Sequence, residues 1–190
     1  MIARVACLVA CLAALPAAVS AHIEAPVDFR TLVASADTIA RGHVTDVRGM
    51  RLPSGEIVSV ATVAVEDALK GSAGPFLSVI VPGGEIGRVR TVMPGAPVLH
   101  VNDAAVFLLR RGVDNVWRLV TLSSGLYRVR RESGTGRIVI DPPAVVGRTA
   151  AAGAVVRGSA LRHPMSVQEF QALVRLMVQA PVQPIRRSRP

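Results

Sequence analysis

A succession of short β-strand patterns constrains the fold of this chain more than any other feature. From Thr38 onward the apolar period is two, and between Glu56 and Leu69 small and apolar residues alternate over a long run. Shorter runs follow, each ended by a turn signal: Phe76 to Pro82, Ile86 to Met93, Ala104 to Arg110, Val116 to Leu122, Gly125 to Arg131 and Gly136 to Asp141. Because no helical pattern separates these runs, residues 38–141 predict an antiparallel barrel or sandwich.

One helix is predicted on each side of the strands. Residues 28–36 start with a possible capping Asp28 and carry apolar residues at helical spacing, namely Phe29, Leu32, Val33 and Ala36. Residues 165–179 begin with the S-x-x-E capping box of Ser166 and Glu169, which Met165 and Phe170 bracket as a hydrophobic staple. The fold class is therefore mainly β, with a short N-terminal helix and a C-terminal amphipathic helix.

The two remaining segments of the C-terminal third lack a packing pattern. Residues 142–164 are rich in Ala, Gly and Val, and we expect a loop or extension there. Residues 180–190 combine three prolines with three arginines, which predicts a disordered basic tail.

The first 21 residues have the pattern of a secretory signal peptide. A short basic start ends at Arg4, an apolar run follows, and small residues place Val19 and Ala21 before the expected cleavage site. This predicts a secreted or periplasmic protein without a membrane span after cleavage. Two alternatives are an uncleaved anchor and lipidation of Cys11, which ends a lipobox-like string. The apolar run is short for an anchor and continues beyond Cys11.

Removal of the signal changes what the composition means. Cys7 and Cys11 leave with it, so the mature chain has no disulfide and no cysteine ligand or nucleophile. The net charge falls from +9 to +8 with the loss of Arg4, and every remaining basic residue except Lys70 is an arginine. These arginines are dispersed and the whole chain has six aromatic residues, which disfavours specific nucleic-acid binding. Contact with another polyanion through arginine stays open.

Recognised catalytic patterns are absent from the sequence. It has no H-E-x-x-H, no G-x-S-x-G and no phosphate-binding P-loop, and Val81 to Gly87 is predicted as a tight turn. Glu66 and Asp67 are adjacent on a strand, so they are expected on opposite faces and cannot flank one substrate bond. His100, Asp103 and Ser123 can be written as a triad, but no nucleophile elbow supports it. We therefore predict no catalytic residue and no cofactor.

Two sets of residues are candidates for binding. Trp117 and Tyr127 lie on neighbouring predicted strands, where they form either a core pair or a ligand platform. The loop Gly83 to Gly95 is predicted to present a partner surface that includes Gly84 and Glu85.

A third candidate is a metal site. Cleavage after Ala21 would make His22 the N-terminal residue, and its amine and imidazole could chelate copper if His43 or His100 came close. A histidine next to a cleavage site is more often incidental.

Six strings of the sequence carry a resemblance to a family. They are IARGHVTDV (39–47), TVAVEDALKG (62–71), VPGGEIG (81–87), PGAP (94–97), NDAAVFLL (102–109) and LYRV (126–129). In this order they resemble a group of uncharacterised secreted bacterial proteins with a TIMP-like or netrin-like domain, sometimes associated with exported metalloproteases.

The resemblance covers about residues 28–132 and implies an OB-like β-barrel over residues 22–141. Tissue inhibitors of metalloproteases chelate zinc through an N-terminal cysteine. The mature chain has no cysteine, so the resemblance does not imply inhibition.

These observations favour a secreted or periplasmic, non-enzymatic binding module with a protein or glycan partner. The alternative is a secreted enzyme, either a copper protein that uses His22 or a hydrolase whose site the sequence does not reveal.

Overall fold

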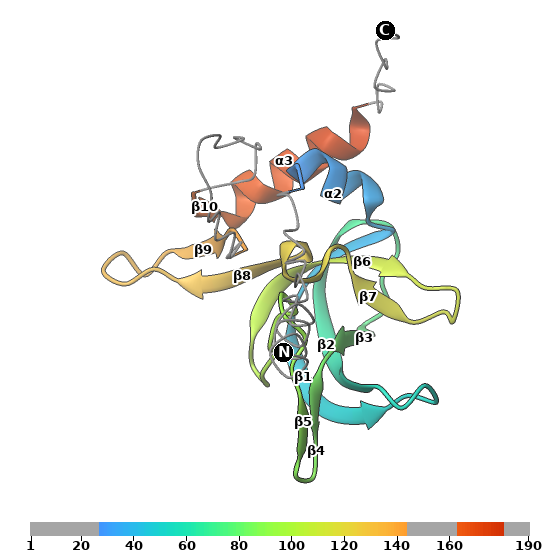
Figure 1. Ribbon diagram of the computed structural model, residues 1–190. Coiled ribbons are helices and arrows are strands. Elements are labelled where there is room, and N and C mark those ends of the chain that lie inside the picture. The colour runs from blue at the N-terminus through green and yellow to red at the C-terminus, as the bar shows by residue number, and fades with distance from the viewer. Residues whose placement is uncertain (1–26, 144–162, 181–190) are drawn as a thin grey trace, which may run out of the picture.

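The computed structural model describes residues 27–143 and 163–180, and a closed five-stranded β-barrel forms its centre (Figure 1). The barrel strands are β1 (Thr38–Arg51), β2 (Ile57–Lys70), β3 (Phe76–Pro82), β6 (Ala104–Arg111) and β7 (Trp117–Leu119). The predicted signal peptide, most of the predicted 142–164 loop and almost all of the predicted tail lie outside the described residues. The predicted mainly β fold with two helices is confirmed.

Two pairings close the barrel. The first half of β1 pairs with β2 on one side and with β6 on the other, from Thr38↔Leu109 to His43↔Ala104. On the far side β3 pairs with β7, which in turn pairs with β6. The β3–β7 contact is parallel, whereas every other pairing between described barrel strands is antiparallel. A parallel pair needs a long connection, and residues 83–116 supply it.

Two further hairpins project from the barrel. The strands β8 (Leu126–Arg131) and β9 (Ile138–Asp141) extend the sheet beyond β6, and β10 (Met165–Ser166) pairs with β9. The strands β4 (Gly84–Ile86) and β5 (Val89–Thr91) form a separate two-stranded sheet.

The sequence predictions are corrected at two places. Gly84 and Glu85, which were expected in a turn, belong to strand β4, and the turn comes at Gly87, whose φ of 58° suits glycine; it interrupts the predicted strand Ile86 to Met93 and leaves β5 at Val89–Thr91. The expected strand Val116 to Leu122 is shortened to β7. It ends because Thr121 and Leu122 adopt positive φ and start the short 3-10 helix η2 (Leu122–Gly125).

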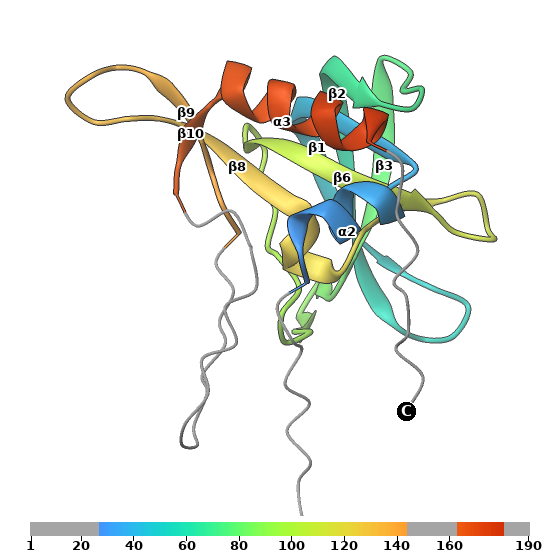
Figure 2. The ribbon, with the colours of Figure 1, turned by 90° about the horizontal axis from the view of Figure 1, so that it is seen from above.

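The buried residues form two clusters, one on each face of the barrel wall. The inner cluster fills the barrel around Phe107 and Val79. The outer cluster lies between the barrel and two helices, α2 (Phe29–Ser35) and α3 (Val167–Gln179), which pack over β6 and β8 (Figure 2). Neither helix, in the part of the chain that is described, is long and apolar enough to cross a membrane.

The starts of the two helices differ in how they are capped. At α3 the predicted capping box is present: the Glu169 N–H donates to Ser166 Oγ, and the Ser166 N–H donates to Glu169 Oε2. The helix begins at Val167 because the two residues before it pair with β9. At α2, Asp28 occupies the expected N-cap position, but its side chain makes no capping hydrogen bond.

Lys70 at the end of β2 holds the C-terminus of α2. Its Nζ donates to the carbonyl oxygens of Val33 at 2.7 Å, Ala34 at 3.3 Å and Ala36 at 2.6 Å. These carbonyls belong to the last turn of the helix, where no intrahelical donor remains, and the ammonium charge also suits this end of the helix dipole.

We predict that Lys70→Met lowers the free energy of unfolding by about 1–3 kcal/mol, because hydrogen bonds from a charged group are lost while the apolar stem is kept. Urea denaturation measures this change. Arg175→Met, at an exposed position of α3, is the control and should change stability by less than about 0.5 kcal/mol. Equal effects of the two substitutions would contradict the role of Lys70.

Candidate ligand-binding site

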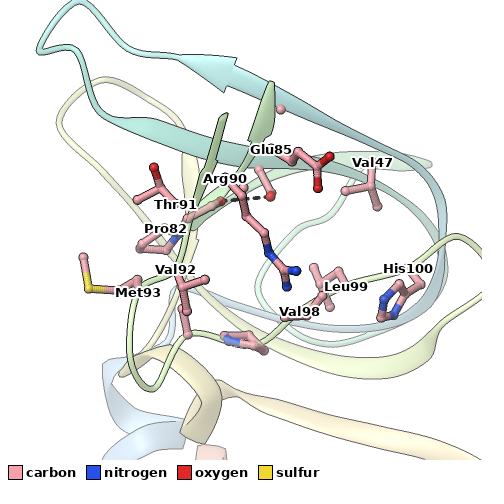
Figure 3. A pocket seen from close by; sticks show the side chains of 16 residues that line it. Val47, Pro82, Glu85, Arg90, Thr91, Val92, Met93, Val98, Leu99 and His100 are labelled. Carbon is pink, nitrogen blue, oxygen red and sulfur yellow. Dashed lines mark hydrogen bonds between the residues drawn. The ribbon is translucent and has the colours of Figure 1, made fainter. Parts of the chain in front are cut away.

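A pocket of about 370 Å³ lies between the β4–β5 hairpin and the segment 92–100 (Figure 3). Its walls include three residues predicted from the sequence as a partner surface, Gly83, Gly84 and Glu85, together with His100. The remaining walls come from β1, β2, the last residue of β3 and residues 90–99. The predicted surface is therefore one wall of a concave site.

Glycines allow the hairpin to lie directly on the barrel. A Cβ atom at Gly49 of β1 would overlap the carbonyl group of Glu85, and one at Gly84 would lie within 3.0 Å of Ser59 Oγ and the Val58 backbone. The Ser59 hydroxyl also donates to the Gly83 carbonyl oxygen at 2.9 Å. The glycines of the predicted turn thus serve close backbone packing.

Arg90 supplies the cationic group of the pocket. It faces Glu85 across the hairpin, but its guanidinium group points into the pocket, as Figure 3 shows. Among the described residues this side chain has no hydrogen-bonding or ion-pair partner. A guanidinium presents five donors in a planar fork, so a ligand carboxylate suits it.

Exposed aliphatic side chains are concentrated in the segment that contains Arg90, and some of them line the pocket. Within residues 89–101, five large apolar side chains are exposed, namely Val89, Val92, Met93, Val98 and Val101. Val92 and Val98 are 71% and 58% exposed, and both line the pocket. Leu99, between them and the barrel, is buried with the inner cluster and anchors the segment. Such a concentration of exposed apolar residues is typical of interaction surfaces.

Asp103 and Arg128 hold the wall that carries Val98. Asp103 Oδ2 accepts from the His100 N–H at 3.0 Å and from Arg128 Nη1 at 2.8 Å, while Arg128 Nη2 donates to the Val98 carbonyl at 2.8 Å. Burial raises the pKa of Asp103, but the hydrogen bonds and positive charges of Arg128 and His100 outweigh burial and leave its pKa below the ordinary 3.8. The ionised carboxylate is therefore the form that stabilises this wall.

This arrangement gives a prediction with a definite pH dependence. Because folding lowers the pKa of Asp103, its stabilising contribution is present above the ordinary pKa and is lost as the pH falls through the lowered value. Asp103→Asn should lower the free energy of unfolding by about 1 kcal/mol at pH 6, and the difference from wild type should shrink below pH 4. Urea denaturation across this range measures it.

The control for this test is Asp46→Asn. The Asp46 carboxylate pairs with Arg48 on the exposed surface, where an ion pair contributes little to stability. A gap between wild type and Asp103→Asn that stayed constant from pH 6 to pH 3 would contradict the assignment.

Trp117 and Tyr127 do not form the platform that was one of the two expectations. Strands β7 and β8 pair with different parts of the same edge of β6, so Trp117 lies opposite Arg111 and Tyr127 lies opposite Val106. Tyr127 is 2% exposed in the outer cluster, and burial together with the charge of Asp28 raises its pKa. Trp117 lies beneath the Arg111 guanidinium, which is 5.2 Å from its ring centroid.

The predicted triad is not assembled in residues 27–143 and 163–180, and the copper site stays a prediction because it requires His22. No three metal-ligating side chains gather within these ranges: His43 Nδ1 lies 3.1 Å from Glu66 Oε1, and His100 lies near Asp103. His22 lies outside the described residues. In the triad, Asp103 is engaged by Arg128, and the Ser123 side chain has no hydrogen bond to Asp103 or His100.

A polar cluster that the sequence analysis missed lies on β1 and β2. Glu66 accepts from Arg41 at 2.6 Å and contacts His43, whereas Asp67 accepts from Gln171 of α3 at 2.7 Å. A register shift leaves Glu66 without a partner residue in β1, since Arg41 pairs with Asp67 and Gly42 pairs with Val65. Glu66 and Asp67 were expected on opposite faces because side chains normally alternate along a strand. This β-bulge interrupts the alternation between them.

Comparison with known proteins adds no family to this description. Neither the protein-family models nor the curated proteins contain a match to the chain.

Proposed function

We propose that this chain is an exported, non-enzymatic binding module and that the pocket beside the β4–β5 hairpin receives its partner. The observation that carries the proposal is the unpaired Arg90 guanidinium, directed into a concave site with exposed aliphatic side chains. One charged anchor with apolar surroundings is the composition expected of a recognition site. The partner is an extracytoplasmic protein.

The barrel topology supports an OB-like fold for this module. The closed order β1-β2-β3-β7-β6, with its parallel β3–β7 contact, is the arrangement expected of an OB-like barrel. Barrels of this type bind through strand faces and connecting loops. The proposed site uses the connection between the third and fourth barrel strands.

The polar groups of the pocket favour recognition over the hydrolase alternative. The hydroxyl of Ser59 donates to the Gly83 carbonyl oxygen. A nucleophile needs a base within hydrogen-bonding reach, and no such partner contacts Ser59 among the described residues.

Site-specific photo-crosslinking tests the binding proposal. A photoreactive residue at Val98, inside the site, should yield adducts with an exported protein that excess unlabelled protein suppresses. The same residue at Leu176, which is 62% exposed on α3, is the control. Adducts of equal yield from both positions, or none from Val98, would contradict the proposal.

Export is tested separately by the N-terminus of the recovered protein. The protein from outside the cytoplasm should begin with His22, Ile23 and Glu24. A start at Met1, or a lipidated Cys11, would overturn the proposed cleavage.

A further inference from the structure

We propose that the ligand of this site is an extended peptide with one acidic residue and an aliphatic residue two positions to either side, added as a strand to β5. The inference rests on the proposed function and specifies the chemistry of its partner. It is carried by the hairpin register, by the side chain of Arg90 and by the apolar residues around it.

The outer edge of β5 carries one backbone N–H group and one backbone C=O group, both from Arg90, that do not bond to β4. A two-residue turn, Gly87 and Arg88, joins β4 to β5, so the pair Ile86↔Val89 beside the turn is hydrogen-bonded. Antiparallel pairs alternate, which makes Glu85↔Arg90 the non-hydrogen-bonded pair. The N–H and C=O of Arg90 therefore point away from β4, and they have no partner among the described residues. An added strand can bond to both groups.

Register also sets which ligand side chain enters the pocket. The ligand residue opposite Arg90 has its side chain on the same face of the sheet as the Arg90 guanidinium. Because that guanidinium has no partner in the described chain, an Asp or Glu carboxylate at this position gains charge-assisted hydrogen bonds. Glu85, also on the pocket wall, repels additional negative charge, which favours one acidic residue over an acidic run.

The neighbouring ligand positions follow from strand geometry. Residues two positions before and after the acidic one lie on the same face, about 7 Å away. The exposed side chains of Val92 and Val98 lie beside the Arg90 guanidinium on this face (Figure 3). Aliphatic ligand residues would bury this apolar surface, and the intervening ligand residues face away from it.

A peptide display experiment tests the inference on the whole mature protein. A library of random linear ten-residue peptides is selected on the immobilised protein, and we expect enrichment of the apolar-x-acidic-x-apolar pattern. For an enriched peptide, Arg90→Gln should weaken binding at least about tenfold in a titration. Arg88→Gln, in the turn of the same hairpin, is the matched control and should change affinity by less than about twofold.

Backbone methylation of the peptide tests strand addition separately from charge. An N-methyl group on the acidic residue removes the amide that faces Arg90 and should abolish binding. The same group on the next residue lies on the opposite edge and should leave binding nearly unchanged.

The inference would be overturned by enrichment of patterns without a carboxylate, by equal binding to wild type and Arg90→Gln, or by the absence of any peptide that binds more tightly than about 1 mM. Selection of helical or polyanionic ligands in place of extended peptides would also overturn it. If Val98 still gave specific crosslinks, the proposed function would stand without this ligand assignment. Absence of those crosslinks would remove the proposed function itself.

Discussion

Phe170→Ala is expected to lower the free energy of unfolding by about 3–5 kcal/mol, the typical cost of truncating a buried aromatic side chain. Phe170 is fully buried in the outer cluster, with its ring centroid 5.5 Å from that of Phe29 and 5.2 Å from that of Tyr127. Truncation leaves a cavity between α2, α3 and the barrel. Urea denaturation followed by far-UV circular dichroism measures the loss.

Two further variants complete this prediction. Leu176→Ala, on the exposed face of the same helix, controls for helix propensity and should change stability by less than about 0.5 kcal/mol. Phe170→Leu retains most of the side-chain volume and should remain folded with an intermediate stability, even if the alanine variant does not fold. A loss below 1 kcal/mol for Phe170→Ala would show that the helices do not depend on this contact.

Gly49→Ala is expected to displace the β4–β5 hairpin and to reduce ligand binding more than tenfold. The new Cβ would overlap the Glu85 carbonyl group, which is backbone and cannot rotate away. The barrel beneath the hairpin should stay closed, because Gly49 lies beyond the part of β1 that pairs with β6. Crosslinking yield from Val98 and titration of a selected peptide measure the effect, while circular dichroism reports the barrel.

The control for Gly49→Ala is Gly55→Ala. Gly55 lies in the β1–β2 turn with a φ of +89°, and a Cβ there would have no neighbour within 4 Å. Its substitution should cost about 1 kcal/mol of backbone strain and leave the pocket intact. Full binding by Gly49→Ala would contradict the assignment of this glycine to hairpin docking.

Much of the fold was predictable because the alternation of apolar residues in strands and the capping of helices depend on residues that are close in the sequence. Strand β3 has the predicted bounds Phe76–Pro82, and the capping box places the start of α3 within two residues. The parallel β3–β7 closure could not be predicted, since it joins residues that are 38 positions apart, such as Val79 and Trp117. The bulge at Glu66 likewise depends on its pairing with β1, which no local pattern reveals.

The glycine-containing strings behind the family resemblance have structural roles in this chain. A Cβ at Gly42 would overlap the Ala64 carbonyl group, and one at Gly71 would overlap that of Asp37. Gly71 directly follows Lys70, so this short stretch both turns the chain and holds α2. These strings therefore describe packing between backbones and carry little information about the ligand.

The candidate site was predicted only in part for a related reason. The loop with Gly83 and Glu85 stood out because glycines cluster there. Arg90 did not stand out, because it is one of many arginines dispersed along the sequence. Some arginine partners are residues distant in the sequence, so a local pattern does not show which arginine is paired. Arg128, for example, is engaged by Asp103, 25 positions away. Other described arginines, such as Arg88 and Arg110, also lack a side-chain partner, and Arg90 differs from them because its guanidinium points into the pocket.

The three aromatic rings of the outer cluster also determine when folding can finish. Phe29 comes from the first described helix, and Phe170 comes from the last. A chain that emerges from its N-terminus cannot bury Phe29 against Phe170 until nearly all of it is available. Contacts between such distant positions slow folding, typically to milliseconds or longer. Among the described elements, the packing of α2 against α3 is therefore the last contact that the chain can complete.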